Sequence, residues 1–149
     1  MTFAATLTTE KVANTISDGP TGVFMHGPTF MANPLACSVA NASINLLLSQ
    51  NWQEKIISIE KWFNLYLESA REIEDVKEVR ILGAIAVLEM RYSINVPLIQ
   101  KEFVKKGIWI RPFGKLVYIM PPYIITKEQV SVLCNVILNI IKKRRYSIN

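Results

Sequence analysis

The spacing of apolar residues changes near residue 76, and this change constrains the fold more than any other feature of the chain. Up to residue 75 the apolar side chains recur at helical spacing, whereas afterwards short β-branched runs alternate with further helical segments. The first part therefore predicts three helices and one long loop, with no strand of its own. Because amphipathic helices need a second layer to cover their apolar stripe, we expect residues 1–75 to end a larger domain and residues 76–149 to form a small α+β domain.

Helix starts are marked by residues whose side chains can accept a hydrogen bond from a backbone N–H of the first turn. The positions of this kind are Thr8 or Thr9, Asn33, Asn95 and Thr126. Pro34 strengthens the second start, since proline suits the first helical position. The helices beginning at Asn33 and Thr126 should run to about residues 49 and 141, and a further helix should cover roughly residues 52–74.

Strands are expected in three places after residue 76. Residues 79–90 are apolar and rich in β-branched side chains, and they read as one long strand with a kink or bulge at Gly83. Residues 108–110 and 116–119 read as two shorter strands separated by a turn at Gly114.

Half of the 149 residues are hydrophobic, and the mean hydropathy is +0.23. Such a composition excludes disorder and predicts either a dense core or apolar surface meant for a partner or for the rest of a larger protein. No apolar stretch reaches the roughly 18 residues of a membrane helix, and no secretory signal is visible. We therefore expect a soluble, cytoplasmic protein that makes no contact with a membrane.

The net charge of +5 is spread along the chain, and the only basic run is Lys142–Arg145. A solvated helix end explains this run better than a nucleic-acid site does. Cys37 and Cys134 fall in apolar helical patterns and are expected to be buried free thiols. With one histidine and two distant cysteines, neither a metal site nor a nucleophile–base pair is predicted.

The loop around residues 26–30, His-Gly-Pro-Thr-Phe, is the first candidate site. Gly27 permits a close approach of the backbone, Thr29 offers a hydroxyl and an N–H, and a helix N-terminus follows, so the segment suits a phosphate. The alternative is a structured turn in which Thr29 bonds locally. His26 is more typical of a packing residue than of a general base.

Arg111 is the second candidate. It lies at a predicted strand end in an aromatic and proline-rich setting, where a guanidinium could hold a carboxylate through two parallel hydrogen bonds. The alternative is a solvated arginine beside a turn.

Two segments, MHGPTFMANPLACSVANASI (residues 25–44) and GIWIRPFGKLVYIMPPYIIT (residues 107–126), resemble class III, ornithine-type aminotransferases. Within that family they are similar to the branch of biotin synthesis that uses S-adenosylmethionine as amino donor. The resemblance covers essentially the whole chain. It implies an α/β pyridoxal-phosphate-dependent transferase of fold type I, of which this chain would be a C-terminal fragment: the helical end of the large domain, then the small α+β domain.

The resemblance also implies roles for particular residues. Pro28 and Thr29 would contact the phosphate of pyridoxal 5'-phosphate in the active site of the other subunit of a homodimer. Gly27 would lie against the substrate, and Arg111 would bind the carboxylate of the oxo acid. The implied reaction moves an amino group from S-adenosylmethionine to 8-amino-7-oxononanoate and yields 7,8-diaminononanoate.

The chain departs from the family pattern because the Schiff-base lysine should precede the region that begins here at Met1. No catalytic residue is therefore expected in these residues, and the isolated chain is expected to have no transaminase activity. Two alternatives remain: another class III aminotransferase of the ornithine type, which the Arg-Pro-Phe-Gly-Lys segment argues against, and a non-catalytic remnant or interaction module.

Overall fold

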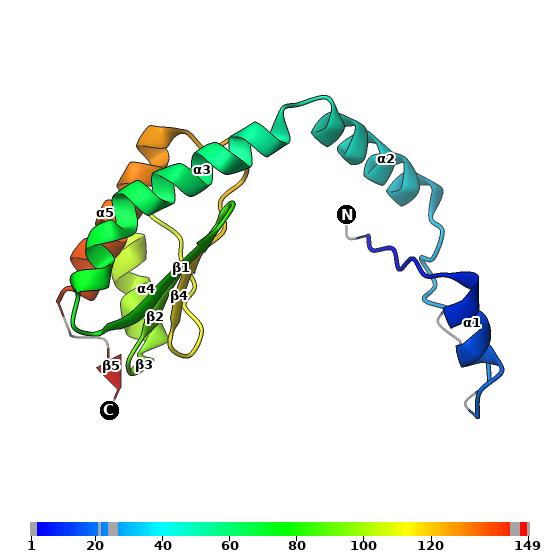
Figure 1. Ribbon diagram of the computed structural model, residues 1–149, viewed down its shortest axis with the longest axis horizontal. Helices are drawn as coiled ribbons and strands as arrows, with labels where there is room; N and C mark the ends of the chain where they lie inside the picture. Colours follow the sequence, from blue (N-terminus) through cyan, green and yellow to red (C-terminus); the bar gives the residue numbers. More distant parts are fainter. Residues whose placement is uncertain (1–2, 21, 24–26, 144–146, 149) are drawn as a thin grey trace. The chain divides into compact units, whose positions relative to one another are not determined.

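The computed structural model describes residues 3–20, 22–23, 27–143 and 147–148. The chain divides into two compact units, Met1–Gln50 and Asn51–Asn149, and each is described here by itself (Figure 1).

Two helices make up the regular structure among the described residues of the first unit. Helix α1 covers Glu10–Ser17, and the Thr9 hydroxyl at its N-cap accepts from the backbone N–H of Val12. Helix α2 covers Pro34–Leu48, with its N-cap Asn33 accepting through the side chain at 3.0 Å from a backbone N–H of the first turn. Both predicted starts are confirmed. They could be predicted from the sequence because each cap joins residues only three positions apart.

The first unit has almost no core of its own. Among its described residues only Ala36 is buried. The large apolar side chains of α2 face outward: Leu35, Val39, Ile44, Leu46, Leu47 and Leu48. An apolar surface of this kind is typical of a segment that packs against another layer. The assignment of residues 1–75 to a larger domain is consistent with this surface but stays a prediction.

The second unit combines three helices with two small sheets. The helices are α3 (Trp52–Leu67), which continues into the 3-10 helix η1 (Glu68–Glu72), α4 (Val96–Lys105) and α5 (Lys127–Ile141). The larger sheet is antiparallel, in the order β1 (Val76–Leu82), β2 (Ile85–Met90) and β4 (Leu116–Ile119). Strands β3 (Ser93–Ile94) and β5 (Ser147–Ile148) form the second sheet, which the sequence did not predict.

Helices cover one face of the larger sheet (Figure 1). Along β2 the buried residues alternate, with Ala86, Leu88 and Met90 in the core and Glu89 partly exposed on the other face. Phe63 of α3 is fully buried within the same cluster. The core therefore lies between the helices and this face of the sheet, and the helices do not cover the opposite face.

Residues 79–90 do not form one long strand, and this prediction was wrong. They belong to a hairpin in which Leu82 pairs with Ile85 around a two-residue turn at Gly83 and Ala84. Gly83 has φ of +56°, a left-handed conformation that glycine adopts without steric cost and that suits the first position of such a turn. The turn is held against α3, because its Gly83 N–H donates to the Glu60 carboxylate at 3.0 Å.

The strand predicted at residues 108–110 is also absent. Ile108 and Ile110 are buried and Trp109 is exposed, which mimics the alternation of a strand. However, the Ile108 N–H donates to the Phe103 carbonyl of α4 at 3.1 Å, and the segment joins no ladder. Side-chain alternation alone does not create a strand when no neighbouring strand is available for pairing.

The remaining local predictions can be compared directly with the elements. Asn95 caps α4, and Thr126 with Gln129 forms a capping box at α5, as expected. Cys134 is buried as predicted, whereas Cys37 is only partly buried. Helix α3 belongs to the compact unit that contains the sheet, and the predicted domain boundary at residues 75 and 76, which concerns a larger protein, stays a prediction.

None of the helices in the described parts of the chain combines the length and the apolar character needed to cross a bilayer.

Candidate functional site

The turn that precedes α2 presents the first candidate residues. The Met31 N–H donates to the Pro28 carbonyl at 2.9 Å, and the Asn33 N–H donates to the Phe30 carbonyl at 3.2 Å. Ala32 has φ of +56°, which is uncommon for a residue with a Cβ. Two successive turns therefore lead into the helix and leave Thr29 on the outside.

Thr29 is exposed, and its hydroxyl makes no hydrogen bond with the described residues. A local bond of this hydroxyl, the alternative considered above, is therefore not formed among them. Gly27 is exposed as well, and a Cβ placed there would meet nothing within 4 Å. His26 lies outside the described residues. A free hydroxyl and an open glycine leave room for a ligand that approaches from outside this unit.

The donor set of this turn fits the phosphate of pyridoxal phosphate. The described residues 27–36 include no carboxylate that would repel an anion. The Thr29 hydroxyl is available as a donor, whereas the side-chain oxygen of Asn33 already accepts from the Ala36 N–H. The turn can therefore supply a hydroxyl donor without first breaking a bond among the described residues.

Arg111 lies on the irregular segment 108–112 of the second unit. Ile108 and Ile110 belong to the core, Pro112 is buried as well, and Arg111 is exposed between the last two. Its guanidinium forms no hydrogen bond or ion pair with the residues that the structure describes. An unengaged guanidinium on a segment fixed by buried neighbours is suited to bind a carboxylate from outside.

Two hollows flank Arg111, with volumes of about 360 and 350 Å³. The first is lined by Trp109, Met120 and Pro121 among others, and the second by Phe113 and Leu116 among others, while Tyr118 lines both. Trp109 is 73% exposed although its side chain is large and mostly apolar. The surroundings of Arg111 thus combine one cation with an apolar and aromatic surface, which suits an acid with an aliphatic chain.

Tyr118 was not selected from the sequence. It lies in β4 between buried Val117 and Ile119, and its ring is on the sheet face opposite the core. The signal that marks it is the period-two alternation of β4, which places its side chain on the outer face of the sheet. That signal identifies the face but gives no indication that Arg111 lies beside it.

Charged side chains of β1 and β2 form ion pairs with one another. Glu89 accepts hydrogen bonds from Lys77 and from Arg80, each at 2.6 Å. These bonds, first that from Lys77 and then that from Arg80, lower the pKa of Glu89 to about 2. Arg80 also donates to Glu78. Among the described residues, the ion pairs of Glu89 are those with Lys77 and Arg80, and none joins it to Arg111.

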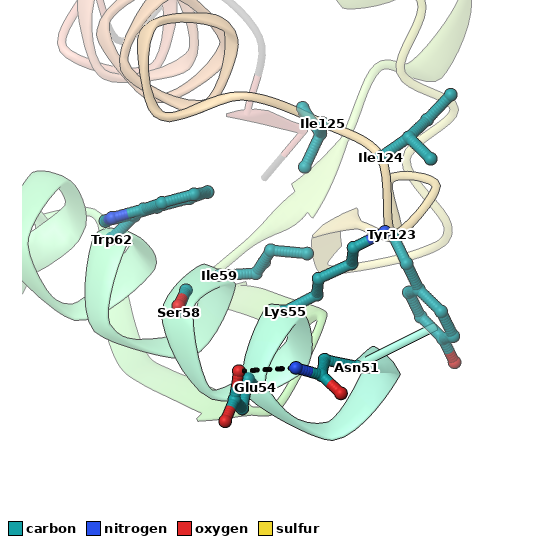
Figure 2. Close-up of a pocket in the computed structure, with 9 residues that line it drawn as sticks. All are labelled: Asn51, Glu54, Lys55, Ser58, Ile59, Trp62, Tyr123, Ile124 and Ile125. Atoms are coloured by element: carbon teal, nitrogen blue, oxygen red, sulfur yellow. Dashed lines mark hydrogen bonds between the residues drawn. The ribbon is translucent and has the colours of Figure 1, made fainter. Parts of the chain in front are cut away.

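Another hollow, of about 430 Å³, lies between α3 and the segment that precedes α5 (Figure 2). Figure 2 shows Trp62, Ile59 and Ile125 along its apolar side, and the side chain of Asn51 donates to Glu54 at 3.2 Å. None of the predicted site residues lines it. It shares Ile125 with the first of the two hollows beside Arg111.

The turn with Pro28 and Thr29 belongs to the first unit, and Arg111 belongs to the second. The structure thus describes the surroundings of the two candidate segments separately. Their meeting in one site stays a prediction.

A model of the family "Aminotransferase class-III" matches residues 1–141. Relatives named adenosylmethionine-8-amino-7-oxononanoate aminotransferase are similar to this chain. One from Buchnera aphidicola (subspecies Acyrthosiphon pisum) is 51% identical over 96% of this chain and 33% of its own length. One from Corynebacterium glutamicum is 47% identical over 90% of this chain and 32% of its own length. The chain spans about a third of the length of the curated relatives it matches.

Solved structures of transaminases are similar to this chain in fold. The Methanocaldococcus jannaschii enzyme with that name superposes with a TM-score of 0.72 at 27% identity, covering 83% of this chain and 31% of the other. An omega-transaminase from Thermomicrobium roseum has a TM-score of 0.76 at 23% identity, covering 90% of this chain and 32% of the other, and shows likeness of fold alone. The predicted fold, that of class III pyridoxal-phosphate-dependent transaminases in part, is confirmed.

Proposed function

Because the chain belongs to the class III aminotransferase family, we propose that it is the C-terminal part of an enzyme that transfers an amino group from S-adenosylmethionine to 8-amino-7-oxononanoate. The proposal includes pyridoxal 5'-phosphate as cofactor, a homodimer for the full-length protein and a cytoplasmic location. The observation that carries it is the 46–51% identity, over at least nine tenths of this chain, to relatives that share one name.

The surroundings of Arg111 support this choice of substrate. The oxo acid ends in a carboxylate at one end of an aliphatic chain, and Arg111 offers an unengaged guanidinium beside Trp109 and Tyr118. Two parallel N–H donors fix the direction of a carboxylate, and the aromatic surface removes water from the aliphatic chain. Arg111 therefore orients the substrate and takes no part in the transfer of protons.

The turn before α2 would hold the other ligand. The cofactor supplies the electron sink of the reaction when it is bound. The Thr29 hydroxyl would donate to its phosphate, and the fixed backbone of Pro28 would keep the turn in shape. Gly27, which has no side chain, would leave space for the substrate. In the proposed dimer these three residues serve the active site of the partner subunit.

A chimera tests the proposal, because this chain spans only a third of its relatives. Residues 1–141 would replace the matching third of the Buchnera aphidicola relative, and formation of 7,8-diaminononanoate from 8-amino-7-oxononanoate and S-adenosylmethionine would be measured. We expect turnover with this pair of substrates and none with ornithine as donor. Turnover with ornithine and none with S-adenosylmethionine would assign the chain to a different class III aminotransferase.

Variants of the chimera test the residue roles separately. Arg111→Met should raise the KM for the oxo acid about 10- to 100-fold, since a charge-assisted hydrogen bond contributes roughly 1.5–3 kcal/mol. Thr29→Val should lower the affinity for the cofactor, which absorbance titration measures. The 149-residue chain alone should show no transaminase activity, and turnover by it would contradict the proposal that the anchoring lysine lies elsewhere.

A further inference from the structure

The segment that carries Arg111 is held by buried side chains and by a neighbouring hairpin, and not by strand pairing. Residues 108–112 join no ladder, so regular strand pairing does not fix the backbone of Arg111. On one side the segment is anchored by the buried side chains of Ile108 and Ile110. On the other side it runs directly into the 113–116 hairpin, in which Phe113 and Leu116 exchange two backbone hydrogen bonds of 2.9 and 2.8 Å.

The 113–116 hairpin is itself tied to the last residue of β2 and to the last residue of β3. The Met90 N–H donates to the Lys115 carbonyl at 2.8 Å, and the Ile94 N–H donates to the Gly114 carbonyl at 3.0 Å. In addition, the Lys115 ammonium donates to the Arg91 carbonyl at 3.0 Å. Lys115 therefore contacts the end of β2 through its backbone and the β2–β3 connection through its side chain.

Arg91 extends this connection to the segment that follows η1. Its backbone N–H donates to the Asp75 carbonyl at 2.8 Å, and its side-chain Nε donates to the Glu74 carbonyl at 2.7 Å. One residue thus receives a bond from the hairpin and gives two bonds to the chain just before β1. These contacts link positions 16 to 24 residues apart along the sequence.

We propose that Lys115 and Arg91 are positioning residues for Arg111, an inference that rests on the proposed function. They hold the 113–116 hairpin in place, and Pro112, whose φ is fixed by its ring, passes that placement on to Arg111. Both acceptors are backbone carbonyls, so the bonds depend on the placement of the donor as well as on its charge. Loss of either bond would leave Arg111 present but less well directed at a carboxylate.

The test compares the oxo acid with its methyl ester in the chimera described above. The ester cannot form the bidentate bond with Arg111, so only the acid reports the direction of the guanidinium. Lys115→Met should raise the KM for the acid about three- to ten-fold, the scale of one lost hydrogen bond. It should leave kcat and the KM for the ester within about two-fold of the parent, since it removes no contact that the ester makes.

Matched variants separate position from charge. Arg91→Lys keeps the positive charge but loses the Nε donor, and it should raise the KM for the acid in the same way. Lys115→Arg keeps both charge and donor and should behave like the parent. Lys105→Met is the control, because Lys105 is an exposed lysine whose ammonium pairs with Glu102 on α4.

The outcomes also separate this inference from the proposed function. If Arg111→Met raises the KM for the acid while Lys115→Met and Arg91→Lys do not, the function stands and the positioning role is refuted. Equal increases for acid and ester would also refute it, since they would indicate a general structural effect. If the parent chimera treats acid and ester alike, the role of Arg111 in the proposed function fails, and the positioning role fails with it.

Discussion

A single methyl group added at Gly83 should destabilise the second unit, and the structure allows the effect to be divided into two causes. Gly83 has φ of +56°, and a Cβ built on it would lie 2.8 Å from Cγ2 of Ile56 on α3. Gly114 has nearly the same φ, +57°, but a Cβ there would meet nothing within 4 Å. The two glycines therefore differ in packing while they share one backbone conformation.

The expected magnitudes follow from this difference. A left-handed conformation costs a residue with a Cβ roughly 1–2 kcal/mol. The reduced freedom of the unfolded chain returns about 0.4–1 kcal/mol, so Gly114→Ala should cost about 0.5–1 kcal/mol. Gly83→Ala should cost a further 1–3 kcal/mol or so, because the Ile56 side chain must move out of a packed contact.

Urea unfolding of the 149-residue chain, followed by circular dichroism, measures both free energies of unfolding. The Ile56→Leu background adds a direct check, because leucine lacks the Cγ2 methyl and removes the overlap. In that background the cost of Gly83→Ala should fall to that of Gly114→Ala. Equal costs for the two glycines in the parent chain would refute the argument that the contact with α3 sets the difference.

Three further predictions concern charge, reactivity and capping. The pKa of Glu89 is lowered from 4.5 to about 2 by its two cationic partners, so its contribution to stability is complete above about pH 4.5 and is lost as the pH falls towards 2. Glu89→Gln should flatten the pH dependence of unfolding in that window. Burial raises the pKa of the Cys134 thiol to about 12, so iodoacetamide at pH 8 should label Cys37 in the folded chain and both cysteines in urea, as mass spectrometry would show. Thr126→Ala should lower the free energy of unfolding by about 1 kcal/mol through loss of the α5 cap, and Thr126→Ser should restore most of it in the same urea assay.

The sequence by itself determined the helices and their starts. Thr9, Asn33, Asn95 and Thr126 each cap the helix that was predicted from them. Each of these caps joins a side chain to a backbone N–H three residues away, so nothing outside the segment is needed to predict it. The motifs around Thr29 and Arg111 likewise indicated the family, since they are continuous in the sequence.

Only the tertiary structure decided the pairing of the strands and the surroundings of Arg111. Residues 79–90 were predicted to be one strand with a kink or bulge at Gly83, whereas the structure forms a hairpin whose Gly83 N–H donates to Glu60 of α3. Residues 108–110 had the alternation of a strand but found no strand to pair with. The bond from Lys115 to Arg91 spans 24 residues. Such contacts depend on the tertiary arrangement of segments that are distant in the sequence. They could not be predicted, because an interaction of this kind has no local sequence pattern.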